Sequence, residues 1–183
     1  YLILTLFSFF FFSMRSSAQI NIERLLTESL EDPVGLDVSE PRFSWVLTSE
    51  RRNTMQEAYE IRVAENERDL KRGRDLRWES GKVSSDASVF VPYQGVPLAS
   101  GKKYYWQARA WDNHGKSSGW SEPASFQMAF LDPEEEFAAQ WISTPEDDDS
   151  QERPSPYFRK AFSLPDGKQI QSATAYITAH GMY

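Results

Sequence analysis

The chain has 183 residues with 27 acidic and 20 basic side chains, which give a net charge of -7. An acidic balance argues against a nucleic-acid-binding protein. There is no cysteine and there are only two histidines, which excludes disulfides, thiolate metal sites and a cysteine nucleophile. The 40% hydrophobic content is enough for a packed core.

Residues 1–18 are predicted to be a secretory signal peptide. A largely apolar run from Leu2 to Phe12 is followed by small residues, with Ser16 and Ala18 at the -3 and -1 positions of a cleavage after Ala18. The run is too short for a stable membrane span, which needs about 18 apolar residues. Since the chain opens on Tyr1 without a basic segment, we expect the signal to be incomplete at its start. We therefore expect a protein exported to the periplasm, cell surface or medium of a bacterium, without reliance on disulfides.

Residues 19–131 have the pattern of an all-β domain. Short alternating runs rich in β-branched and aromatic residues are broken about every eight to twelve residues by turn residues, which predicts an antiparallel β-sandwich of about seven strands. The expected strands lie near residues 25–30, 43–47, 59–63, 76–80, 88–91, 104–112 and 124–129.

A local pattern at residues 98–110 is more specific. Leu98 stands six residues before Tyr104, and the alternation that follows points Tyr104 and Trp106 inward. This segment resembles the corner between strands E and F of fibronectin type III domains, in which the leucine packs beneath the tyrosine and the tyrosine hydroxyl satisfies a backbone group. Trp120-Ser121 is similar to the motif that opens the last strand in cytokine-receptor modules of this fold.

The composition changes after residue 131. Residues 132–156 are acidic and rich in proline, apart from a short segment around Trp141, and are interpreted as a linker. Alternation returns at 157–164 and 172–179, so residues 157–183 are predicted to be the first strands of a second, truncated β-sandwich. So few strands cannot bury both faces of a sheet.

An ordered set of short strings over residues 23 to 183 is similar to the amino-terminal part of bacterial α-L-rhamnosidases. The set comprises Glu28 through Gly35, Pro41-Arg42-Phe43-Ser44-Trp45, Gln56-Glu57-Ala58-Tyr59, Trp78-Glu79-Ser80-Gly81-Lys82-Val83, Trp111-Asp112, Gly119-Trp120-Ser121, Trp141-Ile142, Phe158-Arg159-Lys160 and Ala175-Tyr176-Ile177-Thr178-Ala179-His180-Gly181. The resemblance implies a secreted glycoside hydrolase in which β-sandwich domains precede a helical catalytic barrel.

Enzymes of that family release terminal α-L-rhamnose from plant glycosides and glycans with inversion, which requires two carboxyl groups about 6.5–9.5 Å apart. The family's acids lie in the helical barrel, and no such helical pattern occurs in this sequence. No catalytic residue is therefore carried over, the chain alone is expected to be inactive, and no substrate-binding residue is assigned. The expected partners are the barrel of the parent chain and a rhamnose-containing carbohydrate. The alternative is a free-standing surface adhesion module of fibronectin type III type.

Other candidate site residues have ordinary structural interpretations. His114 lies in a turn and His180 precedes a glycine, so neither is favoured as a ligand or base. Asp112 and Asn113 are possible calcium ligands, but a turn that needs side-chain caps explains them better. We expect no metal and no cofactor.

Aromatic side chains are the remaining candidates for sugar binding. Trp45 and Trp106 fall in the inward phase and are predicted to be core residues. Tyr105, Trp111 and Trp120 fall in the outward phase. We expect Trp120 to stack against the Arg109 guanidinium rather than to form an open sugar platform.

Overall fold

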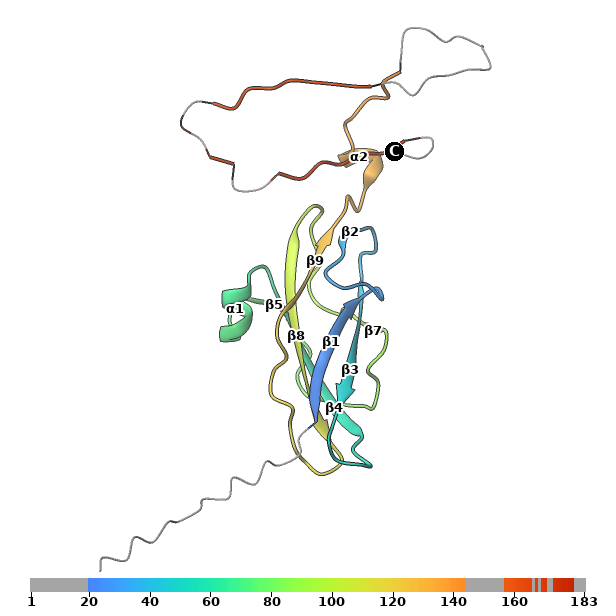
Figure 1. The fold of residues 1–183 in the computed structure, drawn as a ribbon, viewed down its shortest axis with the longest axis vertical. Helices are drawn as coiled ribbons and strands as arrows, with labels where there is room; N and C mark the ends of the chain where they lie inside the picture. The colour runs from blue at the N-terminus through green and yellow to red at the C-terminus, as the bar shows by residue number, and fades with distance from the viewer. Residues whose placement is uncertain (1–19, 144–156, 166, 168, 171–172, 180–183) are drawn as a thin grey trace, which may run out of the picture. The chain divides into compact units, whose positions relative to one another are not determined.

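The computed structural model describes residues 20–143, 157–165, 167, 169–170 and 173–179 (Figure 1). The chain divides into two units, residues 1–138 and 139–183. The predicted signal peptide lies outside the described residues and stays a prediction. Within the described part, no helix is long and apolar enough to cross a membrane.

The first unit is a sandwich of two sheets (Figure 1). The three-stranded sheet has the order β1 (Asn21–Thr27), β3 (Arg42–Thr48) and β7 (Val91–Pro92). The six-stranded sheet has the order β2 (Val34–Leu36), β9 (Ala124–Met128), β8 (Lys103–Asp112), β4 (Gln56–Ala64) and β5 (Leu76–Glu79), and β6 (Val83–Ser84) also pairs with β4. All neighbours are antiparallel except β2 and β9. The expected antiparallel β-sandwich is thus confirmed.

Several expected strands have different bounds, and Trp120 lies outside the last one. The opening strand ends at Thr27 because Glu28 and Ser29 have φ of 50° and 67° and turn the chain back. The segment expected at 88–91 forms only the short β7, although the Trp45 N–H donates to the Ser88 carbonyl at 2.9 Å just before it. The last strand begins at Ala124, so Trp120 precedes β9 rather than opening it.

Two short helices were not expected from the sequence. Helix α1 (Glu67–Arg72) lies in the charged stretch between β4 and β5, where the Asn66 side chain accepts a hydrogen bond from the Asp69 N–H at 2.9 Å. Gly73 closes α1 in the left-handed conformation with φ of 62°. These are standard start and stop signals for a helix. Helix α2 (Pro133–Glu136) begins in the predicted linker.

The core between the sheets is aromatic. Phe43 of β3 packs against Trp106 of β8 with ring centroids 4.4 Å apart. At the predicted corner, the fully buried Tyr104 accepts a hydrogen bond from the Ala99 N–H at 2.9 Å, and Leu98 is buried beside the corner. The prediction from the Leu98 to Tyr104 spacing is therefore confirmed.

The described residues of the second unit contain no strand. Alternation at 157–164 and 172–179 led us to expect strands, but a strand requires the ladder hydrogen bonds of a neighbouring strand. Tyr157 and Phe162 carry exposed side chains in this unit. The second sandwich therefore stays a prediction.

Candidate functional site

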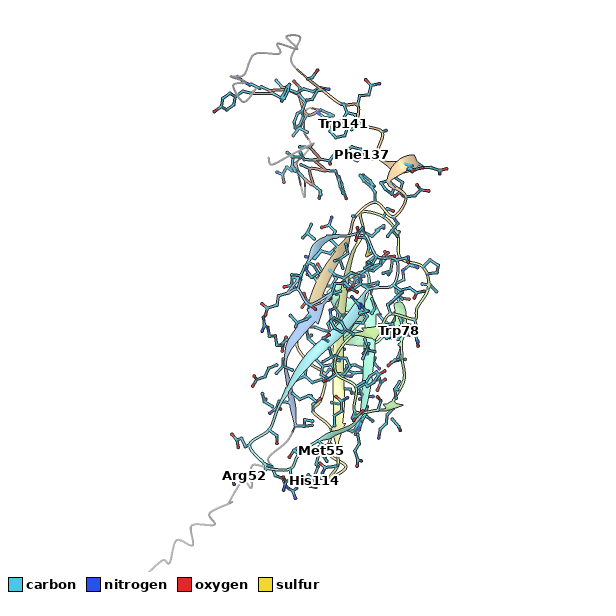
Figure 2. All side chains as sticks on the ribbon, turned by 90° about the vertical axis from the view of Figure 1, so that its right-hand side faces the viewer. Arg52, Met55, Trp78, His114, Phe137 and Trp141 are labelled. Atoms are coloured by element: carbon cyan, nitrogen blue, oxygen red, sulfur yellow. The ribbon has the colours of Figure 1, made fainter. Side chains whose placement is uncertain are left out.

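The part of the chain that the structure describes contains no group of three or more metal-ligating side chains. His114 is exposed at one end of the sandwich, near Arg52 and Met55 (Figure 2). His180 lies outside the described residues. Among the described residues, the His114 side chain has no hydrogen-bond or ion-pair partner.

Asp112 caps the turn that follows β8. Its buried carboxylate accepts hydrogen bonds from the His114 N–H at 2.9 Å and the Lys116 N–H at 2.8 Å. The Asn113 side chain accepts from the Met55 N–H and donates to the Asn53 carbonyl, both at 3.1 Å. Both side chains hold loops together, which is the role that the sequence favoured over calcium binding.

The two inward tryptophans belong to the core, as predicted. The Trp45 indole N–H donates to the Gln56 side chain at 2.9 Å, and both residues are buried. Trp106 is completely buried, and its indole nitrogen has no hydrogen-bond partner among the described residues. Neither indole presents a face to a ligand.

The half-buried Trp120 lies against two guanidinium groups on the outer face of the six-stranded sheet. The Arg109 Cζ is 4.6 Å from the ring, which confirms the predicted contact. The Arg62 Cζ is 4.2 Å from the same ring, a second contact that the sequence did not indicate. Both arginines are oriented by carboxylates, because Arg109 forms an ion pair with Glu60 and Arg62 forms one with Glu79, each at 2.6 Å.

The other outward aromatic side chains are also paired with cations. Trp111 lies 4.8 Å from the Arg109 Cζ and 4.6 Å from the Lys82 Nζ, and Tyr105 lies 5.3 Å from the Lys103 Nζ. Alternation of rings and cations stabilises the sheet and covers apolar surface. These side chains therefore have structural partners instead of open faces.

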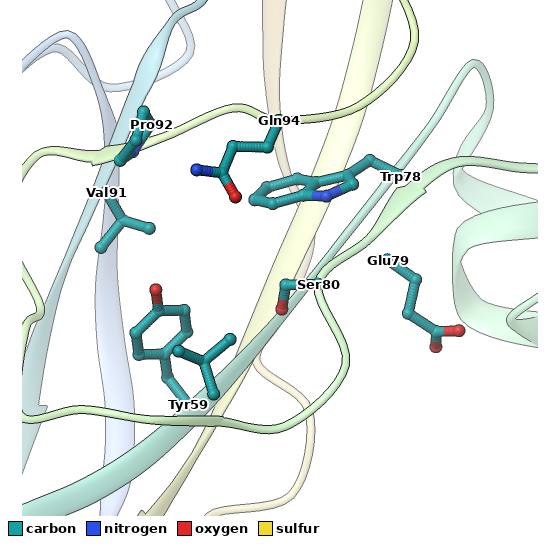
Figure 3. Close-up of a pocket in the computed structure, with 8 residues that line it drawn as sticks. Tyr59, Trp78, Glu79, Ser80, Val91, Pro92 and Gln94 are labelled. Atoms are coloured by element: carbon teal, nitrogen blue, oxygen red, sulfur yellow. The ribbon is translucent and has the colours of Figure 1, made fainter.

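A hollow of about 320 Å³ opens between the two sheets (Figure 3). The side chains around it come from β4, β5, β6, β7 and the segments that adjoin them, and are Tyr59, Trp78, Glu79, Ser80, Val83, Val91, Pro92 and Gln94. We refer to this hollow as the edge pocket.

The edge pocket lies beside β4, close to the point where its pairing with β5 ends and its pairing with β6 begins. β5 pairs with β4 at residues 62–64, and β6 pairs with it at 58–59. Between the two, the Ser80 hydroxyl accepts a hydrogen bond from the Ile61 N–H at 2.9 Å and donates to the Gly81 carbonyl at 2.8 Å. Because β7 is only two residues long, it covers little of this edge.

Trp78 forms a fixed wall of the edge pocket. Its indole stacks on Phe43 with centroids 6.2 Å apart and meets Tyr93 edge-on at 5.3 Å. Burial raises the pKa of Tyr93 to about 12, and its hydroxyl donates to the Val96 carbonyl at 2.7 Å. A Cβ on Gly95 would lie 2.6 Å from the Trp78 Cβ and would clash with the Tyr93 hydroxyl. The absence of a side chain at Gly95 therefore allows the backbone to pack directly against Trp78 and Tyr93.

The Tyr59 hydroxyl and the Gln94 amide of the edge pocket are available to a ligand. Figure 3 shows the Tyr59 hydroxyl directed into the space framed by Val91, Gln94 and Trp78. Tyr59 is 9% exposed, and its hydroxyl has no hydrogen-bond partner among the described residues. Burial raises the pKa of Tyr59, so the group stays a neutral phenol at physiological pH. The exposed Gln94 amide is likewise unpartnered within the described part of the chain.

The sequence did not indicate that the residues of the edge pocket form a binding site. The alternation at 59–63 correctly placed Tyr59 on the inward face, where a tyrosine is expected to pack in the core. The pocket depends on where β5, β6 and β7 end relative to one another. No local motif carries that information.

The fold and surface together define an immunoglobulin-like β-sandwich module that carries the edge pocket and, in its described residues, no metal-ligating cluster. The family described as "Rha78A-like, N-terminal immunoglobulin domain" matches residues 22–132. The chain belongs to this family.

Curated relatives agree with the family. An α-L-rhamnosidase of Formosa agariphila is 30% identical over 98% of this chain, and one of Streptomyces avermitilis is 35% identical over 85% of it. The chain spans only 21% and 17% of the length of these two proteins.

Solved structures show the same likeness. The α-L-rhamnosidase of Streptomyces avermitilis, solved with L-rhamnose, matches 61% of this chain with a TM-score of 0.59 and 38% identity. The enzyme from Dictyoglumus thermophilum matches 62% with a TM-score of 0.60 and 30% identity. The chain covers 11% and 13% of those two structures.

Proposed function

We propose that this chain is the non-catalytic amino-terminal β-sandwich region of an exported α-L-rhamnosidase. In that protein it would pack beside a helical catalytic barrel, which would release terminal α-L-rhamnose from plant glycosides or glycans with inversion. One observation carries the proposal. Relatives named α-L-rhamnosidase align with 85% and 98% of this chain, although it spans at most about a fifth of their length.

The role proposed for the domain is mechanical support. Its aromatic core and the cation–aromatic pairs on its outer face provide a rigid module, whereas the acid and base that act on the glycosidic bond are proposed to lie in the helical barrel. Export would follow from the signal pattern in residues 1–18.

The test compares two forms of the protein expressed from the complete gene, with and without residues 20–131. We expect the shortened form to hydrolyse an aryl α-L-rhamnoside with an unchanged pH profile but to inactivate at a lower temperature. A shortened protein that is folded by circular dichroism and yet has an altered pH profile or no turnover would place a catalytic group in this domain. That result would contradict the proposal.

A further inference from the structure

We propose that the edge pocket binds one neutral pyranose unit of a glycan. This proposal goes beyond the supporting role of the domain and does not depend on it. It rests on the size of the pocket, on its lack of unpaired charge, and on the combination of an indole wall with an unpartnered phenol hydroxyl.

Size limits the ligand to a single ring. The pocket volume of about 320 Å³ is near the lower end of small-molecule sites. One pyranose fits such a volume, whereas a longer oligosaccharide would have to extend from it into solvent. The pocket therefore suits a terminal or branching sugar unit.

Charge excludes an ionic ligand. Glu79 is the one ionisable carboxylate among the lining residues, and it forms an ion pair with the Arg62 guanidinium at 2.6 Å. Figure 3 shows the Glu79 carboxylate turned away from the space between Tyr59 and Gln94. A charged ligand would lose its hydration without gaining a counter-charge, which is unfavourable.

The remaining groups require a ligand that is apolar on one side and hydroxylated on another. Val83, Val91 and Pro92 line the pocket together with Trp78, so a sugar C–H face would find apolar contacts there. The Tyr59 hydroxyl and the Gln94 amide would exchange hydrogen bonds with sugar hydroxyls. A purely apolar group, such as a leucine side chain of another domain, would instead leave the Tyr59 hydroxyl buried and unpaired.

The packing of the wall favours binding over collapse of the pocket. Trp78 is held by Phe43 and Tyr93, and Gly95 closes against it, so the indole is already in place before a ligand arrives. Such preorganisation reduces the entropic cost of binding.

The experiment is an NMR titration of the purified, ¹⁵N-labelled chain with L-rhamnose, D-glucose and D-galactose. The reporter is the indole N–H signal of Trp78, assigned with a Trp78→Phe variant. We expect at least one sugar to shift this signal with a dissociation constant of about 1–10 mM, as is reasonable for a ligand of this size.

Matched variants locate the site. Tyr59→Phe removes only the hydroxyl, and Gln94→Ala removes the amide; each is expected to weaken binding by about three- to tenfold. Tyr105→Phe makes the same chemical change on the outer face and should leave the dissociation constant unchanged. Unfolding midpoints of all variants are measured to show that they are folded.

Two results would overturn the inference. One is the absence of any saturable shift with all three sugars up to about 50 mM. The other is a folded Tyr59→Phe variant that binds sugar as the unmodified chain does. The titration measures binding and not turnover, so either result would leave the proposed non-catalytic role of the domain unaffected. Conversely, if the domain proved to be catalytic, the titration would still report whether the edge pocket binds sugar.

Discussion

The contact of Trp120 with two arginines gives the most quantitative prediction for stability. The guanidinium carbons of Arg62 and Arg109 lie 4.2 Å and 4.6 Å from the indole. Each cation–π contact at a partly exposed site contributes about 0.5–1 kcal/mol, and the ring also covers apolar parts of both side chains. We therefore expect Trp120→Ala to lower the free energy of unfolding by about 2 kcal/mol, with only part of this loss in Trp120→Phe.

Urea unfolding of the whole chain, followed by circular dichroism, measures this loss. A double-mutant cycle with Arg62→Met isolates one contact, because methionine keeps much of the apolar stem and removes the charge. We expect a coupling energy of about 0.5–1 kcal/mol between Arg62 and Trp120. A loss below about 0.5 kcal/mol for Trp120→Ala, or a coupling energy near zero, would refute the reasoning.

Three further predictions concern single interactions, each measured by urea unfolding. Tyr104→Phe leaves the Ala99 N–H without its acceptor and is expected to cost about 1–2 kcal/mol; an unchanged midpoint would show that water replaces the hydroxyl. Gly95→Ala is expected to cost about 1–3 kcal/mol, since the added methyl group overlaps the aromatic wall of the edge pocket, and a neutral effect would contradict that packing. Hydrogen bonds from Arg42 lower the pKa of Glu28 below its ordinary value of 4.5, so the stability from this carboxylate is present above about pH 4.5 and is lost as pH falls through the lowered pKa. Glu28→Gln should therefore be less stable at pH 7 but lose less stability on acidification, and parallel pH profiles would contradict this assignment.

Features set by short sequence separations were predictable. The six-residue spacing of Leu98 and Tyr104 was sufficient to predict the corner and the hydroxyl hydrogen bond, because the tyrosine ring reaches back only a few residues. The inward phase of Trp45 and Trp106 followed from alternation within single strands. To predict the contact between Trp120 and Arg109, it was enough to expect that the segments carrying them are neighbours in the sheet. The prediction held even though Trp120 lies outside β9.

Features set by long-range register were not predictable. Arg62 reaches Trp120 from β4, and nothing in either local sequence indicates that approach. The parallel pairing of β2 with β9 joins strands near opposite ends of the domain. The edge pocket arises from the ends of three short strands, so Tyr59 was expected to be an ordinary core residue.

Hydrolysis of an aryl α-L-rhamnoside by the purified chain tests the central claim most directly. We predict turnover no greater than that of buffer at any pH, because the catalytic carboxyl groups are proposed to lie in a helical barrel, whereas the described residues of this chain form a β-sandwich. Turnover that copurifies with the chain, survives a second purification and disappears on unfolding would contradict the account.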